Sequence, residues 1–95
     1  MAVVRFAPAA LKDLERLAAF LREDDPLAAA ETATLIFRGL RILEEHPLIG
    51  RPLHASRREL VIHRGRTGYL AQYHYDMPGD EVLILAIRHQ REVDG

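Results

Sequence analysis

Six consecutive apolar residues near the end of the chain, 82–87, are the feature that most constrains the fold, and they are followed at once by Arg88, His89, Gln90 and Arg91. An unbroken apolar run of this length is typical of a strand with both faces covered, which predicts a central position in a sheet. Neighbouring strands hold the backbone of a central strand in place. The sequence therefore predicts that the polar groups after residue 87 are presented from a rigid part of the fold.

Three further strands are predicted before this run. Residues 2–6 are rich in β-branched side chains, and residues 59–63 and 69–75 flank a turn that contains glycine. Side chains alternate along 69–75, so that one face of this strand carries Tyr69, Ala71, Tyr73 and Tyr75. A short loop at 76–80 leads into the apolar run.

Apolar residues at helical spacing predict two helices, at about 8–23 and 26–45, and the Pro and Gly residues that follow predict a loop at 46–58. Pro26 disfavours helix at Asp25, whose side chain can cap the second helix, so the short link predicts an antiparallel hairpin. The second helix has a main apolar stripe (Ala30, Ala33, Ile36, Phe37, Leu40 and Leu43) and a second stripe (Ala28, Leu35 and Ile42). We expect one stripe to face the sheet and the other to face the first helix or a partner.

The order of these elements, β-α-α-β-β-β, predicts an α+β fold. A helical hairpin packs on one face of a small twisted, mainly antiparallel sheet, and the first strand pairs with one of the later strands. A chain of 95 residues has the size of one domain, which we expect to span residues 1–95.

Composition excludes several kinds of chemistry. The chain has no cysteine and its five histidines are scattered, so that neither a metal site nor a cofactor is expected. Thirteen Lys and Arg side chains stand against fourteen Asp and Glu, whereas a general nucleic-acid binder usually has a clear excess of cations. No apolar run approaches the roughly 20 residues of a membrane span, and the first residues do not read as a signal peptide. We therefore expect a cytoplasmic protein.

Basic and aromatic residues of the C-terminal half are the remaining candidates for a binding site: Arg57, Arg58, Arg64, Arg66, Tyr69, Tyr73, Arg88, His89 and Arg91. Arg64 and Arg66 flank the turn before residue 69, and the last three follow the predicted central strand. The tyrosines on one face of 69–75 are more often core or cross-strand packing than a platform for stacking bases. No group of residues predicts a catalytic site, because the only serine, Ser56, has no visible base beside it.

Four stretches of the sequence, taken in order, carry a resemblance to a known family. They are PAALKDLERLAAFL, AAAETATLIFRGLRILEEHPLIGRP, RRELVIHRGRTGYLAQYHYD and VLILAIRHQRE. Together they resemble the ParE/RelE superfamily of toxins from type II toxin–antitoxin systems, the plasmid stabilisation toxins. The resemblance covers nearly the whole chain, and the HPLIGRP loop and the closing ILAIRHQR are its most specific parts.

This resemblance implies one of two activities. RelE-like members cut mRNA in the decoding site of the ribosome, ParE-like members poison DNA gyrase, and an antitoxin tail neutralises both. RelE-like enzymes are strongly cationic, carry an Arg where this chain has Leu70, and often have a late Tyr, whereas this chain has none after Tyr75. The resemblance thus implies a ParE-like inhibitor of DNA gyrase. The alternatives are a RelE-like mRNA endonuclease and a toxin fold that has lost its toxicity and only pairs with an antitoxin.

The resemblance also implies roles for individual residues. Target binding is expected at Arg88, His89, Arg91, Arg64 and Arg66. Antitoxin binding is expected at Leu35, Ile42, Tyr69 and Tyr73. The implied partners are a cognate antitoxin, bound in a hetero-oligomer, and DNA gyrase, without a cofactor, a membrane or direct binding of nucleic acid.

Overall fold

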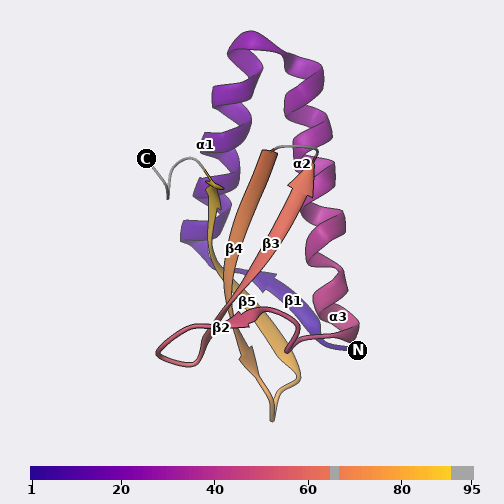
Figure 1. The fold of residues 1–95 in the computed structure, drawn as a ribbon, viewed down its shortest axis with the longest axis vertical. Helices are drawn as coiled ribbons and strands as arrows, with labels where there is room; N and C mark the ends of the chain where they lie inside the picture. Colours follow the sequence, from indigo (N-terminus) through magenta and orange to yellow (C-terminus); the bar gives the residue numbers. More distant parts are fainter. Residues whose placement is uncertain (65–66, 91–95) are drawn as a thin grey trace.

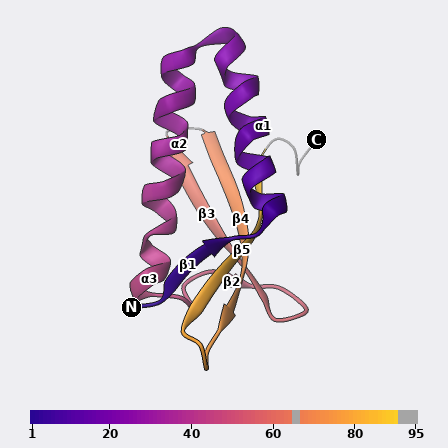
Figure 2. The ribbon, with the colours of Figure 1, turned by 180° about the vertical axis from the view of Figure 1, so that it is seen from behind.

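The structure is a computed structural model that describes residues 1–64 and 67–90. Side chains are described for all of these except 21–24, 63, 64 and 67. Two long helices, α1 (Pro8–Asp24) and α2 (Pro26–Leu40), form a hairpin beside a five-stranded sheet (Figure 1). Seen from behind, both helices lie in front of the sheet (Figure 2). The predicted α+β class, with a helical hairpin on one face, is therefore confirmed.

The strands lie in the order β1-β5-β4-β3-β2. β1 (Val3–Phe6) runs parallel to β5 (Glu81–His89), and β5 pairs antiparallel with β4 (Thr67–Asp76). β4 pairs antiparallel with β3 (Arg57–Arg64), which in turn pairs antiparallel with the short β2 (Arg51–Pro52). The sheet is thus mainly antiparallel and the first strand pairs with a later one, as predicted. β5 lies inside the sheet between β1 and β4, whereas the middle strand is β4.

The core lies between the helices and the face of the sheet that they cover. The sheet contributes the buried side chains of Tyr69, Ala71, Tyr73, Val82, Ile84 and Ile87. The helical layer contributes Ala10, Leu17, Ile36, Leu40 and Leu43. Burial of each large side chain among these stabilises the fold by about 1.5–3 kcal/mol relative to exposure. The predicted shared face of the tyrosine-rich strand is therefore the core face of β4.

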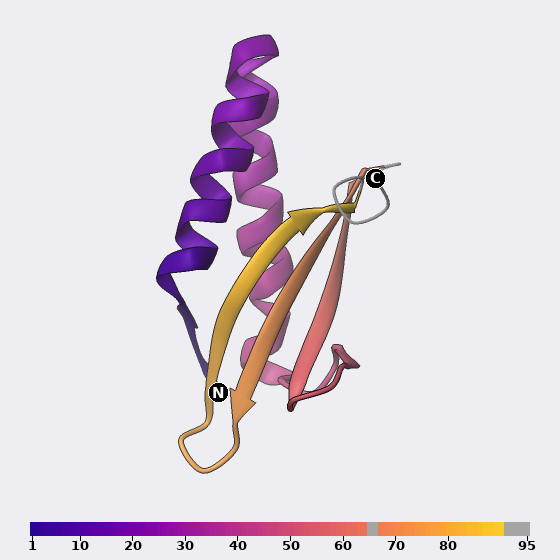
Figure 3. The same cartoon turned by 90° about the vertical axis from the view of Figure 1, so that its left-hand side faces the viewer.

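The other face of the sheet has no helix over it in the described part of the chain (Figure 3). Leu83 and Leu85 of β5 are accordingly only half-buried, whereas Ile84 and Ile87 are buried. The prediction that both faces of this strand are covered is wrong. A β-bulge also explains why the apolar residues do not alternate with polar ones. The register with β4 shifts between Gln72 and Tyr73, which leaves Leu85 as an extra residue in β5.

The hairpin link is formed as predicted, with Asp25 as the N-cap of α2. Its Oδ1 accepts a hydrogen bond from the N–H of Ala28 at 3.2 Å. The predicted single second helix is interrupted at Arg41, after which α3 (Ile42–Glu45) follows. Arg41 has φ −63° and ψ −23°, and its carbonyl accepts from the N–H of Glu44 at 3.1 Å. These values indicate a local tightening to 3₁₀ geometry, so the chain stays helical through the interruption.

The buried stripe of the second helical segment differs from the predicted main stripe. The buried residues are Ala29, Thr32, Ile36, Leu40 and Leu43, whereas Ala30 and Phe37 are exposed. Gly39 sets this rotation, because a Cβ there would lie 3.0 Å from side-chain atoms of Ile62 in β3. The helix therefore approaches the sheet along the line through Gly39, which apolar spacing alone does not reveal.

Candidate functional site

The free edge of β5 begins where β1 ends. Phe6 lies opposite Ile84 in the last pair of the parallel ladder, and β5 continues to His89 beyond it. At this edge Asp13 of α1 accepts a hydrogen bond from the N–H of Ile87, with 2.9 Å between Oδ2 and the nitrogen. An unpaired edge N–H is a template for another strand. Asp13 satisfies the N–H of Ile87 from within the molecule, so this group is not available to pair with another strand.

The same carboxylate holds the first residue of the predicted target-binding group. Arg88 Nη1 lies 2.6 Å from Asp13 Oδ2, with the side chains of Arg88 and Asp13 45% and 14% exposed. Arg16 of α1 lies 3.7 Å from the other carboxylate oxygen. Charge-assisted bonds of this length are stronger than neutral ones. Asp13 therefore fixes the orientation of Arg88 and offsets part of its charge.

Arg88 and His89 diverge from each other, because successive residues of a strand point to opposite faces. The ring of His89 packs edge-to-face against Tyr69, with 5.2 Å between the ring centroids. Arg88 instead lies opposite Leu70 in the antiparallel register and reaches around the edge to α1. The strand end therefore does not present these two side chains as one cluster.

Three other residues of the predicted target site cannot be placed as side chains. Arg64 ends β3, and its side chain is not among those described. Arg66 and Arg91 lie outside the described residues. A role for these three residues in binding the target stays a prediction.

Two of the four residues predicted to contact the antitoxin lie in the core. Tyr69 and Tyr73 are buried in the core under the helices, so their side chains are not available to a partner in this conformation. The alternative interpretation, core packing on the face of β4, is the one that holds. Leu35 is half-buried against the core and Ile42 is exposed, and their contact with an antitoxin stays a prediction.

Tyr73 has a second function that its position in the sequence did not indicate. Its hydroxyl donates to the carbonyl of Pro47 and accepts from the N–H of Gly50, both at 2.8 Å. Burial raises the pKa of Tyr73, and the Gly50 hydrogen bond and the nearby Arg58 guanidinium only partly oppose this effect. The neutral hydroxyl therefore anchors the loop between α3 and β2.

Asp13 is the functional residue that sequence reasoning missed. It lies 74 positions before Ile87, in a helix whose other described polar residues, Lys12, Glu15 and Arg16, are exposed, and no local pattern distinguishes it from them. In the described part of the chain, no three His, Asp or Glu side chains gather in a way that would hold a metal ion. None of the described helices is long and apolar enough to cross a membrane.

The fold and the strand end define a class of small α+β proteins, in which a helical hairpin packs on a mainly antiparallel sheet. A sequence model for the ParE toxin of the type II toxin–antitoxin system, parDE, matches residues 4–94. Toxin RelE3 of Caulobacter vibrioides is 35% identical over 92 residues, which cover 97% of this chain and 98% of the relative. The chain therefore belongs to the ParE/RelE family of toxins from type II toxin–antitoxin systems.

Solved structures share this fold. The chromosomal ParDE system from P. aeruginosa aligns with a TM-score of 0.79 at 22% identity, over 94% of this chain and 96% of that chain. The toxin–antitoxin complex RelBE2 from Mycobacterium tuberculosis aligns with a TM-score of 0.61 at 28% identity, over 94% of this chain and 98% of that one. The architecture is thus found in systems of both the ParDE and the RelBE type.

Proposed function

We propose that this toxin acts as a protein–protein inhibitor of DNA gyrase and that a cognate antitoxin neutralises it. The observation that carries the proposal is the environment of Arg88, which is paired with Asp13 at 2.6 Å and lies opposite the aliphatic Leu70. Because the carboxylate of Asp13 offsets part of the charge of Arg88 and fixes its orientation, Arg88 is better suited to a directional hydrogen bond with another protein than to binding a phosphate group.

Cleavage of RNA through its 2′-hydroxyl needs a base near that hydroxyl and cations that stabilise charge on the phosphorane. Arg88 shares its charge with a carboxylate, and Leu70 stands where the RelE-like pattern has an Arg. The ring of His89 packs against Tyr69. The net charge of −1 adds no general attraction for the ribosome. These features favour gyrase inhibition over mRNA cleavage.

An mRNA endonuclease is the second candidate, and the relative named Toxin RelE3 favours it. A third is a fold that pairs with an antitoxin but has lost its toxicity. The antitoxin itself is supported by the solved toxin–antitoxin complex that shares the fold.

Two assays on the same protein separate the candidates. Purified toxin should inhibit supercoiling of relaxed plasmid by gyrase, and prior mixing with the antitoxin should abolish the effect. Primer extension on transcripts from induced cells should show no cuts in phase with codons. Codon-phased cuts that disappear in His89→Ala would establish the endonuclease instead. Growth without inhibition, together with normal antitoxin binding, would identify the non-toxic pairing protein.

A chain that ends after Gln90 tests the predicted target site. It lacks residues 91–95, which lie outside the described residues. Inhibition of gyrase should fall sharply while antitoxin binding and the melting temperature stay close to those of the full chain. Full toxicity of the folded, shortened chain would remove Arg91 from the target site.

A further inference from the structure

The HPLIG loop at residues 46–50 is held more rigidly than its sequence suggests. Arg58 of β3 donates from Nη1 to the carbonyl oxygens of Leu48 at 3.0 Å and Gly50 at 2.9 Å, and the hydroxyl of Tyr73 makes its two bonds to the same loop. A Cβ on Gly50 would lie 2.6 Å from that hydroxyl, so only glycine fits here. Side chains of β3 and β4 therefore fix the path of this loop.

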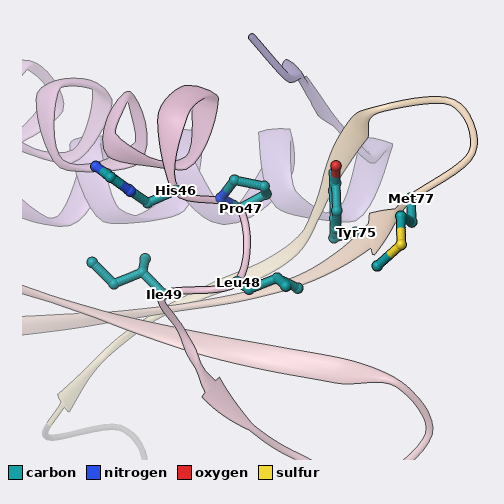
Figure 4. Close-up of a pocket in the computed structure, with 6 residues that line it drawn as sticks. All are labelled: His46, Pro47, Leu48, Ile49, Tyr75 and Met77. Carbon is teal, nitrogen blue, oxygen red and sulfur yellow. The ribbon is translucent and has the colours of Figure 1, made fainter.

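This fixed loop nevertheless exposes large apolar side chains. Leu48 is 49% and Ile49 51% exposed, and Met77, at the end of the neighbouring β4–β5 hairpin, is 66% exposed. Together with His46, Pro47 and Tyr75 they line an open hollow of about 580 Å³, shown in Figure 4. We call this surface the apolar hollow. Apolar side chains that are exposed on a rigid backbone are typical of a binding surface.

An acidic surface borders the apolar hollow. A second depression shares Pro47 and Tyr75 with it and carries the carboxylates of Glu44, Glu45 and Asp80. Arg41 lies 3.9 Å from Glu44 and the N-terminal amine 4.0 Å from Asp80, so these two charges are partly offset. A partner that fills the apolar hollow thus meets negative charge at its rim. The matching chemistry is a segment with apolar side chains flanked by Lys or Arg.

We propose that the apolar hollow is a docking site for the antitoxin, and that it takes an antitoxin segment in which apolar side chains are followed by basic ones. This inference rests on the antitoxin partnership of the proposed function. The apolar side chains lie against Leu48, Ile49 and Met77, and the basic ones lie against Glu45.

Two other occupants fit less well. A second copy of this chain, in a two-fold interface, would bring the acidic rim against itself, and like charges that face each other disfavour association. The proposed gyrase-binding residues lie at the other end of β5, which at about 3.3 Å per residue is roughly 26 Å from Glu81 to His89. The hollow is therefore separate from the proposed target site.

The test measures the affinity of the purified toxin for the cognate antitoxin by titration calorimetry. Ile49→Ser removes an apolar contact, and Leu27→Ser, at an exposed position on α2 away from the hollow, is its matched control. Glu45→Lys reverses a rim charge, and Glu15→Lys on α1, also exposed, is its control. Circular-dichroism melts of each free variant confirm that it is folded.

Ile49→Ser should weaken binding about ten-fold or more, since truncated anchors dominate interface affinity. Glu45→Lys should weaken binding about ten-fold at low salt and clearly less at high salt, because rim charges are screened. Both controls should bind like the wild type. In cells, the Ile49 variant should be toxic even with the antitoxin present. Absence of toxicity in the wild type would count against the proposed function, but it would not affect the comparison of antitoxin affinities that tests the docking site.

Three results would overturn the proposal. The first is unchanged antitoxin affinity in both Ile49→Ser and Glu45→Lys. The second is a free toxin that sediments as a dimer and becomes a monomer in Ile49→Ser, which would assign the hollow to a second copy. The third is loss of gyrase inhibition in Ile49→Ser with normal antitoxin binding, which would assign the apolar hollow to binding of the target.

Discussion

The replacement of Tyr73 by Phe isolates the anchor of the HPLIG loop. The substitution keeps the buried ring and removes only the hydroxyl, which donates to Pro47 and accepts from Gly50, both at 2.8 Å. Loss of the hydrogen bond to Pro47 costs about 1 kcal/mol, and leaving the buried N–H of Gly50 without its partner costs about 1–3 kcal/mol. We expect the free energy of unfolding to fall by about 2–4 kcal/mol, a large share of the 5–15 kcal/mol typical of a domain.

Urea unfolding followed by circular dichroism measures this loss. The midpoint should fall with an unchanged slope, and for a domain of this size the melting temperature should fall by about 10–20 °C. Tyr75→Phe is the matched control, because its hydroxyl donates at 2.7 Å to the exposed Asp80, and a surface change usually stays within about 0.5 kcal/mol. Equal stability of the two variants would refute the claim that the Tyr73 hydroxyl anchors the loop.

Alkaline pH gives an independent readout of the same group. Burial raises the pKa of Tyr73 above its ordinary value of 10.0, so above pH 10 the unfolded chain binds fewer protons than the folded one. The stabilisation is fully present below pH 10 and is lost as the pH rises through the raised pKa. In Tyr73→Phe the free energy of unfolding should fall less steeply above pH 10 than in the wild type. Tyr75→Phe should keep the share of the fall that is caused by Tyr73. A decline in Tyr73→Phe as steep as that of the wild type would contradict the assignment.

Three further outcomes follow from the described contacts. Asp13→Ala removes the acceptor of the Ile87 N–H and the ion-pair partner of Arg88, so urea unfolding should show a loss of about 1–3 kcal/mol, with a smaller loss in Asp13→Asn, which keeps an acceptor. Asp25→Ala removes the cap bond from Ala28 and should cost about 1 kcal/mol in the same assay. Antitoxin at a thousand times its dissociation constant should stabilise the toxin by about 4 kcal/mol, and equal melting temperatures with and without it would contradict a tight complex.

Local pattern was sufficient for the order of the two long helices and four of the five strands and for the capping of α2, but it missed the short β2 inside the predicted loop at 46–58. Periodicity and caps depend on residues within a few positions of each other, as Asp25 and Ala28 show. The unbroken apolar run correctly placed β5 inside the sheet, between β1 and β4, although the middle strand is β4 and the last residues of β5 have a free edge beyond the end of β1. It did not predict the open outer face, because the bulge that makes Leu85 an extra residue arises only from the register with β4.

Contacts between distant segments were decided by the tertiary structure alone. Asp13 acquires its role because α1 crosses the edge of β5 where β1 ends, and the rotation of α2 depends on how closely Gly39 approaches Ile62. The tyrosine-rich face of β4 likewise became core rather than binding surface once the helical hairpin covered it. The composition of the strand is compatible with either environment, because an aromatic side chain packs equally well in a core or an interface, and only the position of the helices distinguishes the two.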